Sequence, residues 1–349
     1  MERKKLLISS LVVCLTLFLG VLFLNPALAT AKEAIKLKVA VSYPARHPMT
    51  VNGFGVWAKK LEERTGGQVK VTLFPGETLS KTNENYDATV SGVCDIAMFL
   101  PAYSAGRFPL SNAMNLPMLF PNSTVASQAA WDLYQKFEEI KAEYRDTKPL
   151  FFYFTPPYEI HTVKKAINTM EDLKGLQIRS TGPIDAKILE TFGASPVAIS
   201  MPEAYLGLER GVLDGLVSPY GPMRGFKTAD VTRFHTSNAN LFSNVFGVVM
   251  NLNKWKSLPP EIQEGIMAVS GSEAARLFGN AFDRTSQPDI KYMKDKGDTF
   301  TTLSPEEKKR WTVAIRGISD NWVKEIGAKG MPSGEILSEM IKLSTKYSK

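Results

Sequence analysis

The feature that most constrains this chain is the segment 176–219, which reads as strand, helix, strand, helix and strand in succession. Pro183 and Pro202 stand near the starts of two helical runs, and Gly193 and Gly211 follow their ends. Proline is favoured in the first turn of a helix and glycine just after the last, so these residues mark the helix boundaries. Strands joined in succession by such short helices form a parallel sheet. The segment therefore predicts an α/β fold.

Three side chains stand where the strands of this segment end. Arg179 follows the first strand, Met201 the second and Ser218 the third. Ligands of parallel sheets collect beyond the carboxyl ends of the strands. The planar guanidinium of arginine gives a carboxylate two parallel hydrogen bonds and stays protonated at any physiological pH. The position therefore favours Arg179 as an anion-binding residue, and a structural ion pair is the alternative interpretation.

The N-terminal half repeats the same order of elements with a different sequence. Strands are expected at 37–41, 69–74 and 95–99, with helices at 52–65 and 83–91. Two such units predict two similar lobes, linked by a long helix that starts at Leu258-Pro259-Pro260 and reaches about residue 285. We expect residues 30–154 with about 244–285 to form the first lobe. Residues 155–243 with about 286–349 are expected to form the second lobe and covering helices.

The first 29 residues read as a secretory signal. Three basic residues precede an apolar run at 6–24, and Ala27-Leu28-Ala29 supplies a small-residue cleavage site. The run is also about long enough to span a bilayer, so a retained membrane anchor is the alternative. A lipoprotein at Cys14 is disfavoured, because Val13 rather than a small residue precedes the cysteine.

Charge and cysteine content exclude several classes of protein. The formal net charge is +7, and removal of the signal lowers it to +5. Basic residues are scattered among acidic ones without interleaved aromatics, which argues against a nucleic-acid-binding surface. Cys94 is the one thiol left after cleavage, so no disulfide can form within the mature chain, and we expect this residue in the core.

Catalytic motifs are sparse. His47, His161 and His235 are far apart and form no H-x-x-x-H pair, so a zinc site is unsupported, and neither a P-loop nor a G-x-S-x-G elbow occurs. We expect no metal and no cofactor. A triad of Cys94 or Ser218 with His161 stays open, because sequence order carries no geometric information.

A binding pocket is what these residues favour. Polar or aromatic side chains stand near the predicted strand ends, and Phe242 and Phe246 are expected in the core. The candidate ligand-binding residues are Arg179, Ser218, Met201, Glu159, Tyr220, Phe99, Ser42, His161 and Asn244.

Several motifs closely resemble the extracytoplasmic solute receptors of tripartite ATP-independent periplasmic (TRAP) transporters, of the DctP type. The likeness covers nearly all of the mature chain. The motifs are EDLKGLQIR at 171–179, Gly193-Ala194, Glu203-Ala204-Tyr205, GVLDG at 211–215, GRFPL at 106–110, Leu116-Pro117 and MNLNKWKSLP at 250–259.

The resemblance implies a two-lobed periplasmic-binding-protein fold of the type II-like class, with a mostly parallel sheet in each lobe. It implies a periplasmic receptor, not an enzyme, that closes on an organic acid and delivers it to the small and large membrane subunits of a TRAP transporter. We expect a monomer, with a dimer as the alternative. A secreted enzyme on the same fold and a ligand sensor that docks on a membrane signalling protein are the competing functions.

The family's carboxylate-binding arginine falls on Arg179. This chain departs from relatives that bind sialic acid or C4-dicarboxylates, which commonly have a second arginine in place of Glu159, an asparagine in place of Ser218 and an aromatic residue in place of Met201. A second carboxylate would face Glu159 without compensation. We therefore expect a monocarboxylate, aromatic or otherwise bulky, with Met201, Phe99 and Tyr220 as walls. An acid bearing an amine or hydroxyl near Glu159 is the close variant.

Overall fold

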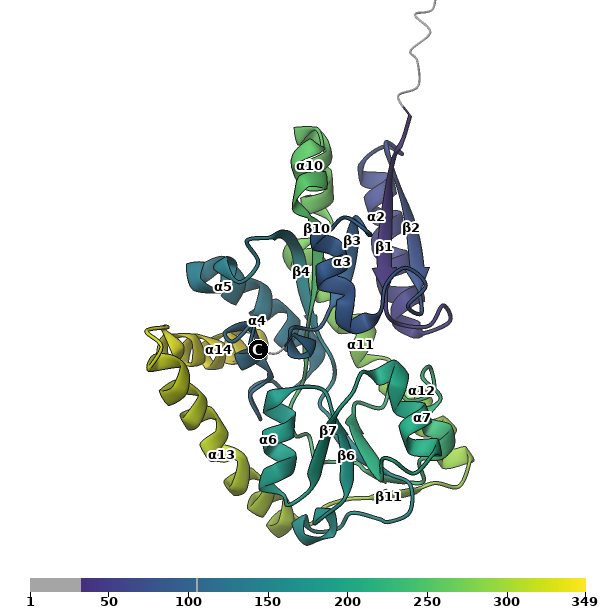
Figure 1. Cartoon of the computed structure of the whole chain (residues 1–349), viewed down its shortest axis with the longest axis vertical. Coiled ribbons are helices and arrows are strands. Elements are labelled where there is room, and N and C mark those ends of the chain that lie inside the picture. Colours follow the sequence, from purple (N-terminus) through teal and green to yellow (C-terminus); the bar gives the residue numbers. More distant parts are fainter. Residues whose placement is uncertain (1–32, 105) are drawn as a thin grey trace, which may run out of the picture. The chain divides into compact units, whose positions relative to one another are not determined.

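The computed structural model describes residues 33–104 and 106–349, and Lys36–Lys349 form one compact unit. The expected signal segment 1–29 lies outside the described residues. Two β-sheets form the frame of the unit, and helices cover them (Figure 1). We call each sheet with its flanking helices a lobe. The two-lobed α/β fold predicted from the sequence is confirmed.

The first lobe contains a five-stranded sheet in the order β2-β1-β3-β10-β4. Its strands are β1 (Ile35–Val41), β2 (Val69–Pro75), β3 (Ile96–Phe99), β4 (Thr147–Phe154) and β10 (Val245–Asn251). Strand β3 runs parallel to β1, whereas β10 returns late in the sequence and runs antiparallel to both β3 and β4. The sheet is therefore mixed, which differs from the mostly parallel sheet expected.

The second lobe contains a six-stranded sheet in the order β11-β9-β5-β8-β6-β7. Its strands are β5 (Glu159–Thr162), β6 (Gln177–Ser180), β7 (Ser195–Ala198), β8 (Gly215–Ser218), β9 (Phe234–Thr236) and β11 (Thr299–Thr301). The predicted β-α-β-α-β segment is confirmed, because β6 pairs in parallel with both β7 and β8. Sequence reasoning missed β5, β9 and β11. Each has only three or four residues, and, unlike the equally short β6, β7 and β8, none is connected by the helices that Pro183, Gly193, Pro202 and Gly211 mark.

Helices follow the predicted boundaries closely, with one exception. The long linking helix, expected to start at 258–260 and reach about residue 285, breaks after Ala268, where Ser270 is extended and Gly271 has a φ of +53°. The helices are η1 (Met49–Gly55), α2 (Val56–Arg64), η2 (Thr82–Glu84), α3 (Asn85–Val90), η3 (Pro101–Tyr103), η4 (Ser111–Asn115), α4 (Ser123–Lys136), α5 (Glu138–Ala142), η5 (Met170–Leu173), α6 (Pro183–Thr191), α7 (Met201–Glu209), α8 (Thr228–Val231), α9 (Leu252–Ser257), α10 (Pro260–Ala268), α11 (Gly271–Asp283), α12 (Ser286–Asp295), α13 (Pro305–Gly327) and α14 (Ser333–Tyr347).

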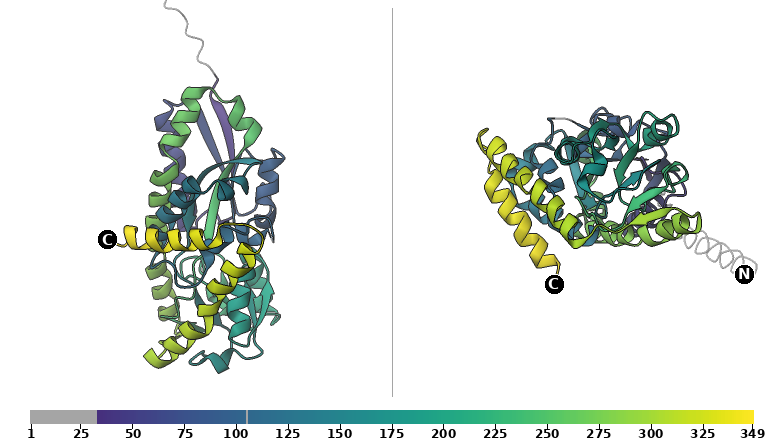
Figure 2. Two further views of the ribbon diagram at one scale, coloured as in Figure 1. Left: turned by 90° about the vertical axis from the view of Figure 1, so that its left-hand side faces the viewer. Right: turned by 90° about the horizontal axis from the view of Figure 1, so that it is seen from below.

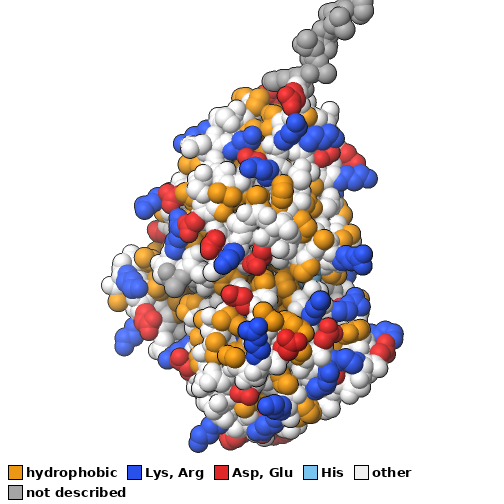
Figure 3. Space-filling model, turned by 45° about the vertical axis from the view of Figure 1, so that its right-hand side comes forward, with side chains coloured by type: hydrophobic (Ala, Val, Ile, Leu, Met, Phe, Trp, Pro, Cys, Tyr) orange, Lys and Arg blue, Asp and Glu red, His pale blue; other side chains and the backbone are white. Residues whose placement is uncertain are grey.

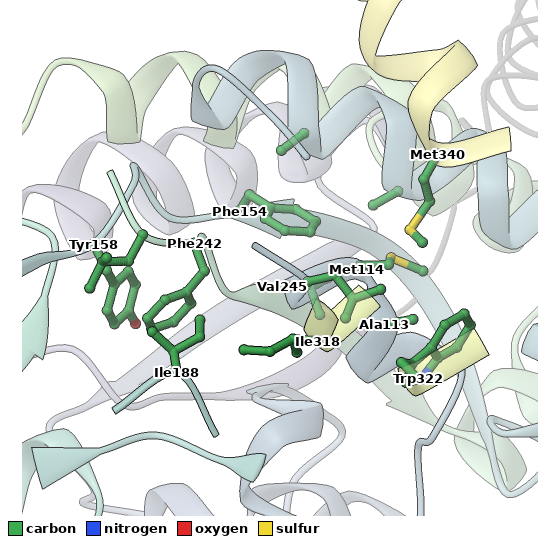
Figure 4. Close-up of a cluster of buried hydrophobic side chains, with 14 of the residues drawn as sticks. Ala113, Met114, Phe154, Tyr158, Ile188, Phe242, Val245, Ile318, Trp322 and Met340 are labelled. Atoms are coloured by element: carbon green, nitrogen blue, oxygen red, sulfur yellow. The ribbon is translucent and has the colours of Figure 1, made fainter. Parts of the chain in front are cut away.

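The last two helices connect the lobes. Helix α13 packs against α6 of the second lobe and then against α14, which packs against α4 of the first lobe (Figure 2). One apolar core accordingly includes Phe154 of the first sheet together with Ile188, Ile318 and Met340 from these helices (Figure 4). The prediction that Phe242 belongs to the core is confirmed, since the residue is buried in the same cluster. Cys94 is also buried, as expected.

The surface agrees with the interpretation of the charge pattern. On the face drawn in Figure 3, Lys and Arg side chains lie among Asp and Glu rather than forming a patch of one sign. None of the helices in the described part of the chain is long and apolar enough to cross a membrane.

The close packing of side chains around Gly247 of β10 predicts that a larger residue at this position destabilises the fold. A Cβ atom on Gly247 of β10 would lie 2.4 Å from the ring of Phe99 and 3.2 Å from that of Phe152. Because such overpacking forces side chains or backbone to shift, Gly247→Ala should lower the free energy of unfolding by about 1–3 kcal/mol. Urea denaturation measures the change.

The matched control for this substitution is Gly317→Ala in α13. A Cβ added at Gly317 meets no atom of the described chain within 4 Å. Alanine is a better helix former than glycine, so this variant should be more stable by up to about 1 kcal/mol. Equal stabilities for the two variants would contradict the packing argument.

Candidate functional site

A cavity lies between the two lobes and is lined by residues of both. Most of its wall is apolar or aromatic, as in small-molecule sites. Arg179 is the one charged residue among the described residues that line it. The lining consists of Ser42, Tyr43, Thr82, Met98, Leu100, Tyr103, Thr155, Tyr158, Arg179, Met201, Pro202, Ser218, Pro219, Pro222, Phe226, Phe246 and Phe282.

Arg179 is held rigidly at this cavity. It lies on β6, between the edge strand β7 and β8, where its backbone pairs with Val197 of β7 and Leu216 of β8. Its Nε donates to the carbonyl of Ile199 at 3.0 Å, and its Nη1 donates to the carbonyl of Val217 at 3.3 Å. Both acceptors come from the ends of neighbouring strands, so the sheet itself orients the guanidinium.

The positive charge of Arg179 has no ion-pair partner among residues 33–104 and 106–349, although the residue is only 2% exposed. Asp185, at the start of α6, feels the Arg179 charge, but its carboxylate accepts hydrogen bonds from the backbone N–H groups of Thr181 and Gly182. Burial raises the pKa of Asp185, and these hydrogen bonds and Arg179 oppose the rise. A desolvated, unpaired cation is costly, so the site is suited to an anion.

Four of the sequence-predicted residues meet at the cavity: Ser42, Arg179, Met201 and Ser218. Ser42 follows β1 and its hydroxyl accepts a hydrogen bond from Asn85 Nδ2 at 3.1 Å. Ser218 ends β8, and its Oγ donates to the carbonyl of Pro219 at 2.8 Å. The rule that ligands collect at strand ends therefore brought together residues of both lobes.

Glu159 lies outside the cavity lining. Its carboxylate accepts hydrogen bonds from Thr236 Oγ1 at 2.6 Å, from the Ala239 N–H at 2.9 Å and from the Asn240 N–H at 3.2 Å. The side chain is buried, and burial raises its pKa against the effect of these hydrogen bonds. The carboxylate thus ties strand β5 to the segment after β9, and the argument that it repels a second ligand carboxylate has no support in this geometry.

His161 and Tyr220 lie behind the wall rather than in it. His161 Nε2 contacts the carbonyl oxygen of Ser218 at 3.0 Å, and His161 Nδ1 contacts His235 Nδ1 at 2.9 Å. The Tyr220 hydroxyl donates to the carbonyl of Thr236. These contacts do not make a hydrolytic triad, because the imidazole of His161 faces the Ser218 carbonyl and not its Oγ.

Phe99 and Asn244 are also absent from the lining. Phe99 packs in an aromatic cluster, with its ring centre 5.0 Å from that of Tyr86 and 5.4 Å from that of Phe108. Asn244 stands one layer back, where its Nδ2 donates to the Tyr158 hydroxyl at 2.9 Å. Phe246, expected in the core, is buried and lines the cavity as well.

Sequence reasoning missed much of the aromatic wall. Tyr43 directly follows Ser42 at the end of β1, so the strand-end rule could have included it. Tyr103 stands four residues after β3 in the loop before the GRFPL motif. Phe226 and Phe282 had no local signal, because only the tertiary fold brings α11 and the segment before α8 to the same cavity.

Comparison with known proteins decides the family. The sequence profile of bacterial extracellular solute-binding protein family 7, DctP, matches residues 40–325. The chain belongs to this family. It is 26% identical over 283 residues to the 2,3-diketo-L-gulonate-binding periplasmic protein of Escherichia coli, covering 80% of this chain and 84% of that one. It is also 26% identical over 318 residues to the C4-dicarboxylate-binding periplasmic protein of Rhodobacter capsulatus, covering 85% and 93%.

Solved structures of TRAP solute-binding proteins share the fold. The protein from Rhodoferax ferrireducens with copurified benzoate has a TM-score of 0.87 and 26% identity, covering 90% of this chain and 99% of that one. A marine metagenome protein specific for aromatic acid ligands, with bound 3-hydroxybenzoate, has a TM-score of 0.86 and 28% identity, covering 91% and 100%. The DctP-type chain is accordingly an extracytoplasmic solute receptor, and its relatives bind carboxylates of several kinds.

One wall of the cavity rests on a neutral histidine, which predicts acid sensitivity. His47 stacks on Tyr43 at 4.5 Å between ring centres, and its Nδ1 accepts a hydrogen bond from the Met49 N–H at 3.1 Å. Burial lowers the pKa of His47 from 6.5 to about 3. Below pH 6.5 the unfolded chain takes up a proton at this position while the folded chain does not. Folding stability should therefore fall by about 1.4 kcal/mol per pH unit from this group alone as the pH drops below 6.5.

His47→Asn isolates this contribution, since asparagine keeps an acceptor for Met49 and has no proton to gain. Urea denaturation of both proteins at pH 7 and pH 5 should show a loss of stability that is about 2 kcal/mol smaller in the variant. The same acid dependence in both proteins would show that His47 takes up its proton in the folded state.

Proposed function

We propose that this receptor captures an aromatic or similarly bulky monocarboxylate and delivers it to the small and large membrane subunits of a TRAP transporter. The single observation that carries the proposal is the buried, unpaired guanidinium of Arg179 in a cavity whose wall is otherwise uncharged. One carboxylate neutralises one cation. The remainder of the ligand meets aromatic rings, methionines and prolines.

The lining disfavours a dicarboxylate for a reason that differs from the one suggested by the sequence. Glu159 points to backbone N–H groups instead of the ligand, but no second cation among the described residues lines the cavity to pair with a second carboxylate. Burying an uncompensated carboxylate is strongly unfavourable. The C4-dicarboxylate specificity of the Rhodobacter relative is therefore not expected here.

Related structures support an aromatic acid. Besides the complexes with benzoate and 3-hydroxybenzoate, a TRAP solute-binding protein from Bordetella bronchiseptica, 26% identical to this chain, has bound mandelate. Each of these ligands combines one carboxylate with one benzene ring. The aromatic wall formed by Tyr43, Tyr158 and Phe226 offers such a ring offset-stacked or edge-on contacts.

Capture depends on both lobes. The cavity takes Ser42, Tyr43 and Met98 from the first lobe and Arg179 and Ser218 from the second. A ligand that contacts both lobes stabilises the closed state over the open one, and the size of the shift equals the difference in affinity between the two states.

We further propose that segment 1–29 is a cleaved signal, that the mature protein acts in the periplasm and that it is a monomer.

Calorimetry of the purified protein tests the ligand class. Titration with benzoate, 3-hydroxybenzoate and mandelate should give binding, and succinate and malate should bind at least about 100-fold more weakly, because the second carboxylate stays unpaired. Tight binding of succinate or malate with no binding of any monoacid would refute the proposal.

Arg179→Met tests the anchor. Loss of the charged hydrogen-bonding partner should weaken binding of the cognate acid by roughly 100-fold or more. The unfolding temperature without ligand should change little, since removal of a desolvated charge offsets the lost hydrogen bonds. Arg210→Ala, at an exposed position on the same lobe, is the control and should bind normally. Unchanged affinity of Arg179→Met would remove the ion-pair mechanism.

A further inference from the structure

Tyr103 of the first lobe touches the anion-binding arginine of the second. Its hydroxyl oxygen accepts a hydrogen bond from Arg179 Nη2 at 2.9 Å and another from the backbone N–H of Met201 at 3.1 Å. Tyr103 ends η3, four residues after the end of β3, whereas Arg179 lies on β6 and Met201 begins α7. One phenol oxygen therefore joins the first sheet's loop to the strand ends of the second sheet.

The hydroxyl group of Tyr103 has one hydrogen-bond donor that is not used within the described chain. A tyrosine hydroxyl has two lone pairs and one proton, and both contacts above use lone pairs. The proton has no acceptor among the described residues of the chain. Burial raises the pKa of Tyr103 and the Arg179 charge opposes the rise, so the phenol keeps this proton at neutral pH. The side chain is partly buried and lines the cavity, so this donor is available to a group held in the cavity.

Arg179 also has unused hydrogen-bond donors next to the Tyr103 hydroxyl. Its guanidinium carries five N–H groups, and three of them are used by Ile199, Val217 and Tyr103. The other two, one on each terminal nitrogen, have no acceptor in the described part of the chain. Together with the Tyr103 proton, three donors at one end of the cavity thus lack an acceptor, and a carboxylate has two oxygens able to accept several hydrogen bonds.

The loop that carries Tyr103 depends on contact between the lobes. A Cβ atom added to Gly182, at the start of α6, would lie 2.8 Å from the Ala102 Cβ and 2.9 Å from its carbonyl oxygen. Gly182 itself has a φ of −167°, which any residue adopts. The absence of a side chain at 182 is therefore needed for close approach of the lobes, not for backbone conformation.

We infer that Tyr103 is a ligand-binding residue that donates its hydroxyl proton to the carboxylate held by Arg179, so that recognition of the anion and closure of the lobes are one event. The inference rests on the proposed function, because it needs a carboxylate at Arg179. It assigns to the first lobe a polar contact with the anion.

Tyr103→Phe tests the inference with benzoate as the probe. Loss of one hydrogen bond to a charged group should weaken benzoate binding roughly tenfold to hundredfold. Because the phenol joins the two lobes around the cavity, most of this factor should appear as faster dissociation in stopped-flow measurements, with little change in association. Tyr292→Phe, whose hydroxyl bonds Asp230 on the surface, is the matched control and should leave both rates unchanged.

A second variant acts on lobe contact without touching the phenol. Gly182→Ala should push η3 away from α6 and weaken benzoate binding, whereas Gly317→Ala should not.

If the native protein binds benzoate and Tyr103→Phe binds it equally well, the inference fails and the proposed function stands. If Tyr103→Phe lowers the unfolding temperature equally with and without benzoate, Tyr103 is structural only and the inference also fails. If the native protein binds no monoacid, both proposals fall.

Discussion

The site depends on a positive charge that the fold buries without neutralising. Arg179 has its guanidinium fixed by the carbonyls of two neighbouring strand ends, and the nearby carboxylate of Asp185 is occupied by backbone N–H groups. Desolvation makes an unpaired cation unfavourable, and this cost is removed only by an anion that enters the cavity. The same arrangement that weakens the empty protein locally therefore gives the ligand carboxylate much of its binding free energy.

Support for this charge comes from residues that never reach the ligand. Glu159 ties β5 to the segment after β9, and the buried pair His161 and His235 connects β5 with the carbonyl of Ser218 at the end of β8. A wall built in this way is rigid, because each polar group already has partners and none is free to turn toward the ligand. Polar residues near a strand end thus divide into those that face the cavity and those that hold it in place.

The sequence predicts those parts of the structure whose determinants lie close together in the chain. Proline and glycine at 183, 193, 202 and 211 marked a β-α-β-α-β unit correctly, and the strand-end rule located Arg179, Met201 and Ser218. The return of 244–285 to the first lobe was expected, but the antiparallel direction of β10 and the short strands β5, β9 and β11 had no local signal, because pairing partners lie far apart in the chain. Glu159 was misjudged for the same reason: its partners at 236–240 are about 80 residues away. Tyr103 and Phe282 reach the cavity only through tertiary packing.

The two lobes meet the ligand with different chemistry, and this difference bears on how closure is triggered. The second lobe presents the permanent charge of Arg179, which attracts any anion at long range. The first lobe presents aromatic rings and the hydroxyl of Tyr103, which act only at contact distance. An anion that binds Arg179 alone gains nothing from closure and shifts no equilibrium. An acid whose ring packs on the apolar wall and whose carboxylate reaches Tyr103 gains binding free energy from both lobes at once. The charge of Arg179 therefore attracts the ligand, and the shape of the ligand decides whether closure is favoured.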